Sequence, residues 1–101
     1  MNIKLVKRPP SGVELRLEGR LDTSSAPAAQ EAFLKVAGEY AQIELNFTEL
    51  AYVSSAGLRA LLVLQKQVNK TGGSLVLTHV SPAIMEVFEM TGFSGILSIQ
   101  P

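Results

Sequence analysis

Residues 45–62 read LNFTELAYVSSAGLRALL, and this stretch decides the class of fold. It begins inside a polar and apolar alternation over 42–47, which predicts a strand with one buried face. After a loop expected over 48–53, leucines and valines recur at helical spacing, so we expect a helix over 55–71. A strand that leads into an amphipathic helix is the repeating unit of an α/β fold.

The segments on either side of this stretch add further strands and helices. Residues 9–12, Pro-Pro-Ser-Gly, favour a reversal of the chain and so predict an initial hairpin. Ser24 or Ser25 is available as the N-cap of the next helix, and glycines are placed to end each helix. The expected elements are strands over 3–8, 13–18, 42–47 and 74–78, helices over 26–38, 55–71 and 81–92, and a last strand over 96–99.

This order of elements predicts an α/β fold in a single domain over residues 1–101. An antiparallel hairpin would be followed by parallel strands with right-handed helical crossovers. Charged and polar residues alternate with apolar ones in the expected strands: Glu14, Arg16, Glu18, Glu44 and Asn46. We therefore expect most helices to cover one face of the sheet, which disfavours a doubly wound nucleotide-binding fold.

The composition excludes several classes of function. Of the 101 residues, 47% are hydrophobic, nine are basic and nine are acidic, so the formal net charge is zero. Without a basic cluster, we expect binding neither to a nucleic acid duplex nor to an anionic membrane surface. The longest apolar run, residues 60–64, is far too short to span a bilayer, so insertion into a membrane is not expected either. The chain has no cysteine, which excludes disulfides, thiolate metal sites and cysteine nucleophiles, and a reducing cytoplasm fits this composition.

Residues able to perform catalysis are scarce. His79 is the single histidine, too few for a metal site, so we expect no metal and no cofactor. No phosphate-binding glycine loop and no nucleophile elbow is present. The sequence therefore favours a protein that is not an enzyme. A small enzyme or ligand-binding domain stays open as an alternative, and a polar pocket would support it.

The start of the expected helix over 55–71 carries two hydroxyls. Ser54 or Ser55 could serve as N-cap, and Gly57 could serve close packing against a strand or a partner. The outer face of that helix is expected to be small and weakly apolar, formed by Ala56, Arg59, Ala60 and Val63. Such a face suits docking to another protein, although alanine is also simply a good helix former.

These residues resemble the STAS domains of bacterial anti-sigma factor antagonists. The resemblance rests on 45–62 and on three further segments: Gly19-Arg20-Leu21-Asp22, Gly72-Gly73, and Ser81-Pro82 through Met90-Thr91-Gly92-Phe93. It implies that Ser55, two residues before Gly57, is phosphorylated by a partner anti-sigma factor that is also a serine kinase. Ser54 stands where the family often has aspartate.

The resemblance also implies the partners and the contact residues. A serine-kinase-type anti-sigma factor would bind the unphosphorylated protein, and a serine phosphatase would reset Ser55. The alternative is an unphosphorylated scaffold or an accessory subunit, for example of a lipid transporter. A weak homodimer is also compatible with the sequence. The partner-binding residues that we expect are Asp22, Thr23, Ser54, Ser55, Ala56, Gly57 and Arg59.

Overall fold

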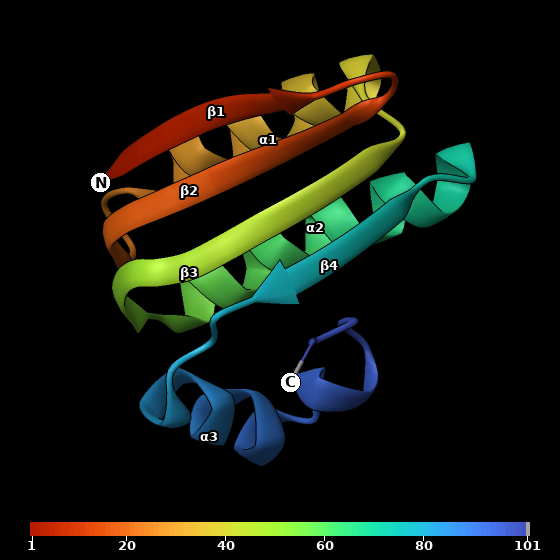
Figure 1. Cartoon of the computed structure of the whole chain (residues 1–101). Coiled ribbons are helices and arrows are strands. Elements are labelled where there is room, and N and C mark those ends of the chain that lie inside the picture. The colour runs from red at the N-terminus through yellow and green to blue at the C-terminus, as the bar shows by residue number, and fades with distance from the viewer. Residues whose placement is uncertain (101) are drawn as a thin grey trace.

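Four strands form one sheet in the order β1-β2-β3-β4 (Figure 1). β1 pairs antiparallel with β2, and β2, β3 and β4 run parallel. The computed structural model describes residues 1–100. Its elements are β1 (Asn2–Arg8), β2 (Gly12–Leu21), α1 (Ala26–Glu39), β3 (Gln42–Val53), α2 (Ser55–Thr71), β4 (Ser74–Thr78), α3 (Pro82–Thr91) and the 3-10 turn η1 (Phe93–Gly95). The predicted α/β class, with its hairpin followed by parallel strands, is confirmed.

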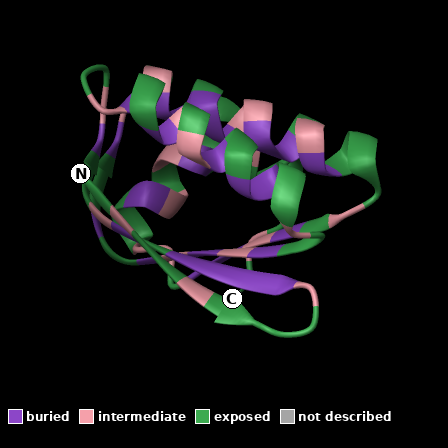
Figure 2. Ribbon diagram, turned by 90° about the horizontal axis from the view of Figure 1, so that it is seen from above, coloured by how far each residue is buried: buried purple, intermediate pink, exposed green. Residues whose placement is uncertain are grey.

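α1 and α2 lie side by side on one face of the sheet, as the sequence predicts (Figure 1). Their buried residues face the strands, and their outer surfaces are exposed (Figure 2). α3 lies beyond the β4 edge of the sheet (Figure 1), and the ring of Phe88 meets the ring of Phe47 on β3 edge to face at a centroid distance of 6.2 Å. One continuous apolar core therefore joins the three helices to the sheet.

The opposite face of the sheet is polar, but it is not uniformly exposed. Glu14 lies there with only 2% of its surface accessible, because Arg8, Arg16 and Asn46 surround its carboxylate. Asn46 donates to Oε2 at 2.8 Å and Arg16 Nε donates to the same oxygen at 3.2 Å. The amide of Asn46, with help from the two guanidinium groups, lowers the pKa of Glu14 to about 2 against the opposing effect of burial.

Two expectations about the ends of elements are wrong. Residues 48–53 are not a loop, because β3 continues to Val53 and pairs with β2 along this length. Register shifts at Arg16/Glu18 and Gly19/Arg20 break the simple alternation that would have revealed this strand. Residues 96–99 form no strand: after η1, only an isolated bridge joins Ile99 to Leu77.

α1 continues one residue beyond the predicted end at Gly38, because Glu39 remains helical and Tyr40 is the C-cap. Gly72 ends α2 in the left-handed conformation that a glycine adopts without strain, with a φ of 77°. Within residues 1–100, no helix is long and apolar enough to cross a bilayer.

Candidate functional site

The carboxyl ends of β2 and β3 lie next to each other and bring two predicted site segments together. Leu21 pairs with Val53 in the parallel ladder. One residue further, the backbone N–H of Ser54 donates to the carbonyl oxygen of Leu21 at 2.8 Å. Asp22 and Ser55 therefore follow neighbouring strands at the same end of the sheet, as expected from the parallel order.

Ser54 is the N-cap of α2. Its backbone is extended, with φ −91° and ψ 176°, and its Oγ accepts a hydrogen bond from the N–H of Gly57 at 3.2 Å. This bond satisfies one of the N–H groups that have no partner within the helix. The choice between the two serines, which the sequence left open, is therefore decided: Ser54 caps the helix.

Ser55 is the first residue of α2, and it is exposed. Among residues 1–100, its Oγ takes part in no hydrogen bond. Ala56 beside it is small and half-buried, so it leaves the approach to the hydroxyl open. The site thus presents one serine hydroxyl that the fold does not use, directly beside one that it does.

Gly57 and Ala60 are both buried. The sequence left Gly57 open between close packing and a partner contact, and it placed Ala60 on the outer face of the helix. A Cβ on Gly57 would stand 2.6 Å from the carbonyl oxygen of Leu21 and 3.1 Å from a methyl of Val53, so the helix can approach the sheet only with glycine here. Ala60 is 1% exposed. It shares a helical face with Leu64, one turn along, which also packs inward. Ala60 therefore does not belong to the exposed face of α2. The glycine at position 57 is required by the close packing of α2 against the end of β2.

Asp22 holds the turn between β2 and α1. Its Oδ1 accepts from the N–H and the Oγ of Ser24, at 3.1 and 2.8 Å, and from the N–H of Ser25 at 3.1 Å. These bonds, the Ser24 hydroxyl first, lower the pKa of the carboxyl group. Ser25 is the N-cap residue of α1 but donates its Oγ to the carbonyl of Arg20 instead of capping. Thr23 projects from the turn and is exposed.

Two residues at the site were absent from the predicted set. The Arg20 guanidinium lies 4.2 Å from the centre of the Tyr52 ring, and Arg20 and Tyr52 are partners in the β2–β3 ladder. Arg20 Nε is also 3.6 Å from Oδ2 of Asp22. Arg20 therefore contacts both the aromatic ring of Tyr52 and the carboxylate of Asp22. Only the register of two distant strands pairs Arg20 with Tyr52, so no local sequence pattern could have indicated this contact.

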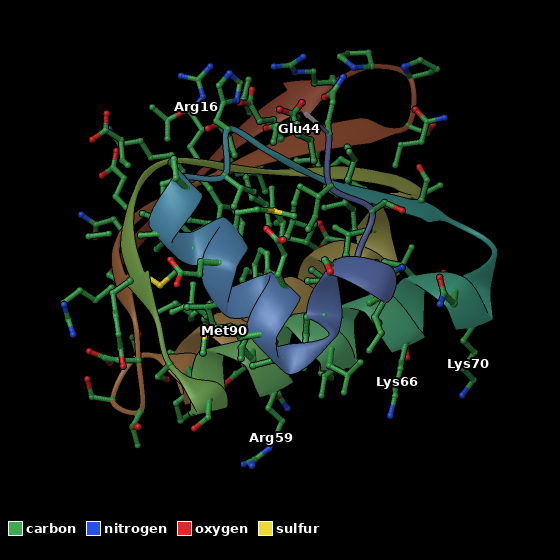
Figure 3. The ribbon with its side chains drawn as sticks, turned by 90° about the horizontal axis from the view of Figure 1, so that it is seen from below. Arg16, Glu44, Arg59, Lys66, Lys70 and Met90 are labelled. Atoms are coloured by element: carbon green, nitrogen blue, oxygen red, sulfur yellow. The ribbon has the colours of Figure 1, made fainter. Side chains whose placement is uncertain are left out.

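Arg59 is exposed on α2 and points away from the sheet (Figure 3). It lies four residues after Ser55, a spacing that brings two side chains to the same side of a helix. The expected positions of Ser55 and Arg59 on one side are therefore compatible with the structure.

The rest of the described chain offers little for catalysis. No group of three or more metal-binding side chains occurs in the described residues. A cavity of about 890 Å³ lies between the end of β4 and the C-terminal segment, where His79 and Ser94 are among the lining residues. It does not include Asp22 or Ser55, so it forms no part of the site at the start of α2.

Comparison with known proteins agrees with the fold. The sequence-family model for the STAS domain matches residues 2–101 of this chain. The chain belongs to the STAS domain family. A relative in Bacillus subtilis, the anti-sigma-B factor antagonist, is 31% identical over 100 residues that cover 98% of this chain and 92% of the relative. The anti-sigma F factor antagonist of Paenibacillus polymyxa is also 31% identical, covering 98% of this chain and 87% of its own.

Solved STAS structures share this architecture. The anti-sigma factor antagonist SpoIIAA in its unphosphorylated form superposes with a TM-score of 0.77 at 22% identity, covering 99% of this chain and 88% of SpoIIAA. An anti-sigma factor antagonist from Mycobacterium paratuberculosis reaches a TM-score of 0.86 at 18% identity, with coverage of 99% and 85%. At these identities the likeness establishes the STAS fold.

Proposed function

We propose that this STAS domain is a cytoplasmic anti-sigma factor antagonist, without enzymatic activity, that binds a serine-kinase-type anti-sigma factor and loses that binding when Ser55 is phosphorylated. One observation carries the proposal: Ser54 caps α2, and Ser55 presents a free, exposed hydroxyl one residue later. The names of the Bacillus subtilis and Paenibacillus polymyxa relatives support the antagonist role.

A phosphate on Ser55 is compatible with the fold. It would add a charge of about −1.5 to −2 at the first residue of α2, where the helix dipole favours negative charge. Ser55 is exposed and its Oγ forms no hydrogen bond within residues 1–100, so its modification breaks no hydrogen bond of the folded state. The effect of the phosphate is therefore expected at the interface with the partner and not in the core.

The surroundings of Ser55 explain how one phosphate could change partner binding. Asp22, held ionised by its hydrogen bonds, follows the neighbouring strand, and Arg59 lies one helical turn beyond Ser55. Unphosphorylated, the site offers the partner a hydroxyl at the start of α2, with a carboxylate at the end of the neighbouring strand and a cation one helical turn away. With the phosphate, it offers a strong negative charge that Arg59 can pair with. A coupling of about 3 kcal/mol would change the affinity about 150-fold.

The proposal is tested with the kinase-type anti-sigma factor from the same organism. Isothermal titration calorimetry would compare wild type with Ser55→Glu and with Ser94→Glu, an exposed serine on η1 that adds the same charge elsewhere. We expect Ser55→Glu to weaken binding about 100-fold, Ser94→Glu to bind like wild type, and all three thermal melts to agree. A serine phosphatase should restore binding of the phosphorylated wild type.

Two results would contradict the proposal. Equal binding by wild type and Ser55→Glu would remove the switch, even with the antagonist role intact. Absence of binding to the anti-sigma factor, together with co-purification of a transporter ATPase, would assign the chain to the accessory role instead.

A further inference from the structure

The zero net charge of the chain hides an uneven distribution among its helices. α2 carries Arg59, Lys66 and Lys70 and no acidic residue. In contrast, α1 mixes two glutamates with one lysine, and α3 has two glutamates and no cation. A solvated helix more often interleaves both signs, because oppositely charged residues one turn apart stabilise it.

The three cations form one exposed stripe, which we call the cationic face of α2. All three side chains point away from the sheet (Figure 3). Their spacing of seven and four residues keeps them on one side of the helix, and the stripe extends about 16 Å along the axis. Leu62 and Val63, both half-buried, lie between the first two cations. The surface is therefore cationic with apolar residues within it.

Within the described part of the chain, the cations of this face have no ion-pair partner, as is also true of the isolated cations Lys7 and Lys35, but only on α2 do three such cations share one helix face. In the sheet, four cations form ion pairs with carboxylates: Lys4, Arg8, Arg16 and Arg20. Among residues 1–100, no carboxylate lies within ion-pair distance of the three cations of α2. Arg59 also gains nothing from the helix dipole, which favours cations at the opposite end.

We propose that the cationic face of α2 docks on an acidic surface of the anti-sigma factor, an inference that rests on the proposed function. The face begins at Arg59, one turn from Ser55, and is thus continuous with the surface that the partner would cover. A protein fits better than a nucleic acid, because three cations interrupted by Leu62 and Val63 match a mixed acidic and apolar surface. Nucleic acid binding usually requires a larger basic patch.

Reversing the charges of the cationic face near the C-terminal end of α2, away from Ser55, tests this inference separately from the Ser55 switch. The test variant is Lys66→Glu/Lys70→Glu, and the control is Lys7→Glu/Lys35→Glu. Lys7 and Lys35 are exposed cations on β1 and α1, so the control changes the net charge equally. Calorimetry with the anti-sigma factor would be run at 50 and 500 mM NaCl, with thermal melts of each protein. Lys66→Gln/Lys70→Gln serves as a milder variant if the reversal destabilises α2.

We expect the Lys66→Glu/Lys70→Glu variant to bind about tenfold or more weakly at low salt and the control to bind nearly as wild type. The difference in affinity between wild type and the Lys66→Glu/Lys70→Glu variant should become smaller at 500 mM NaCl, because salt screens exposed charges. Equal binding by both double variants, with wild-type binding intact, would overturn the inference alone. Failure of wild type itself to bind would overturn the proposed function as well.

A gel-shift assay with a 20-base-pair DNA duplex tests the nucleic acid alternative. If wild type binds the duplex, and if the α2 charge reversal removes that binding but leaves binding to the anti-sigma factor unchanged, the face binds nucleic acid and the proposal is overturned.

Discussion

The starts of α2 and α3 use the same cap but differ at the next residue. Ser54 and Ser81 are both extended N-cap residues, with ψ of 176° and 156°, and each side chain accepts from the N–H three residues on, at 3.2 and 3.3 Å. At the first helical position, α3 has Pro82, which suits this place because it lacks an N–H. α2 has Ser55 there, and its hydroxyl is exposed.

The third helical position differs as well. In α3 it is Ile84, a buried core residue that anchors the helix, whereas in α2 it is Gly57, which allows close contact with the end of β2. The serine cap and the residue at the third position are therefore accounted for in both helices by the stability of the fold. What α2 has beyond that requirement is Ser55, and the fold gives no structural reason for a serine at this place.

The largest effect on stability is expected at Gly57. In Gly57→Ala, the new Cβ would stand 2.6 Å from the Leu21 carbonyl oxygen and 2.8 Å from its Cγ, so the start of α2 must move outward. We expect a loss of about 3 kcal/mol in the free energy of unfolding, measured by denaturant titration. Gly38→Ala is the control, because a Cβ at Gly38 would have no atom within 4 Å other than its chain neighbours and the backbone of its own helix. A loss below about 0.5 kcal/mol would show that the close approach is not required.

Acid should weaken the fold through the sheet, since neither helix cap contains a titratable side chain. The pKa of Glu14 is about 2 in the folded state against 4.5 ordinarily. Because the folded-state value is the lower one, its stabilisation is present above pH 4.5 and is lost as the pH falls toward 2. Between pH 5 and pH 3 this amounts to about 2 kcal/mol.

Denaturant titrations at both pH values would measure this loss in wild type and in Glu14→Gln. The variant lacks the ionisable group, so its stability should fall less over the same interval. Identical pH dependence in the two proteins would contradict the role given to Glu14.

The two caps should contribute equally. Ser54→Ala and Ser81→Ala each remove one hydrogen bond to the third N–H of a helix, so each should cost about 1 kcal/mol. Chemical denaturation of both variants measures this directly. A negligible cost for Ser54→Ala would mean that Ser55 can replace it as cap, which would weaken the division of roles between the two serines.

The smallest effect on stability is expected at Ser55. Its Oγ makes no hydrogen bond within residues 1–100, so Ser55→Ala should change the free energy of unfolding by less than about 0.5 kcal/mol. Thermal and denaturant unfolding beside Ser54→Ala would show the contrast. A loss comparable with that of Ser54→Ala would mean that the fold itself requires the Ser55 hydroxyl.

The order of the four strands and three helices followed from local periodicity, and the hairpin turn with the right-handed crossover rule indicated which strands run antiparallel and parallel. The exceptions are the end of β3 and the strand expected over 96–99. The division of roles between Ser54 and Ser55 did not follow from local periodicity, since both are good N-cap residues and only the backbone angles decide between them. Ala60 was misplaced because the buried face of α2 is wider than its leucine stripe, and β3 was cut short where Thr48 and Glu49 are both exposed. The contact of Arg20 with Tyr52 depends on strand register, which no local pattern encodes.

Site-resolved phosphorylation tests the central claim most directly. Wild type, Ser54→Ala and Ser55→Ala would be incubated with the kinase-type anti-sigma factor and ATP, and the modified residue located by mass spectrometry. The account predicts one phosphate on Ser55 in wild type, the same site in Ser54→Ala, and none in Ser55→Ala. Phosphate on Ser54, or an unmodified Ser55 in a wild-type protein that binds the kinase, would contradict it.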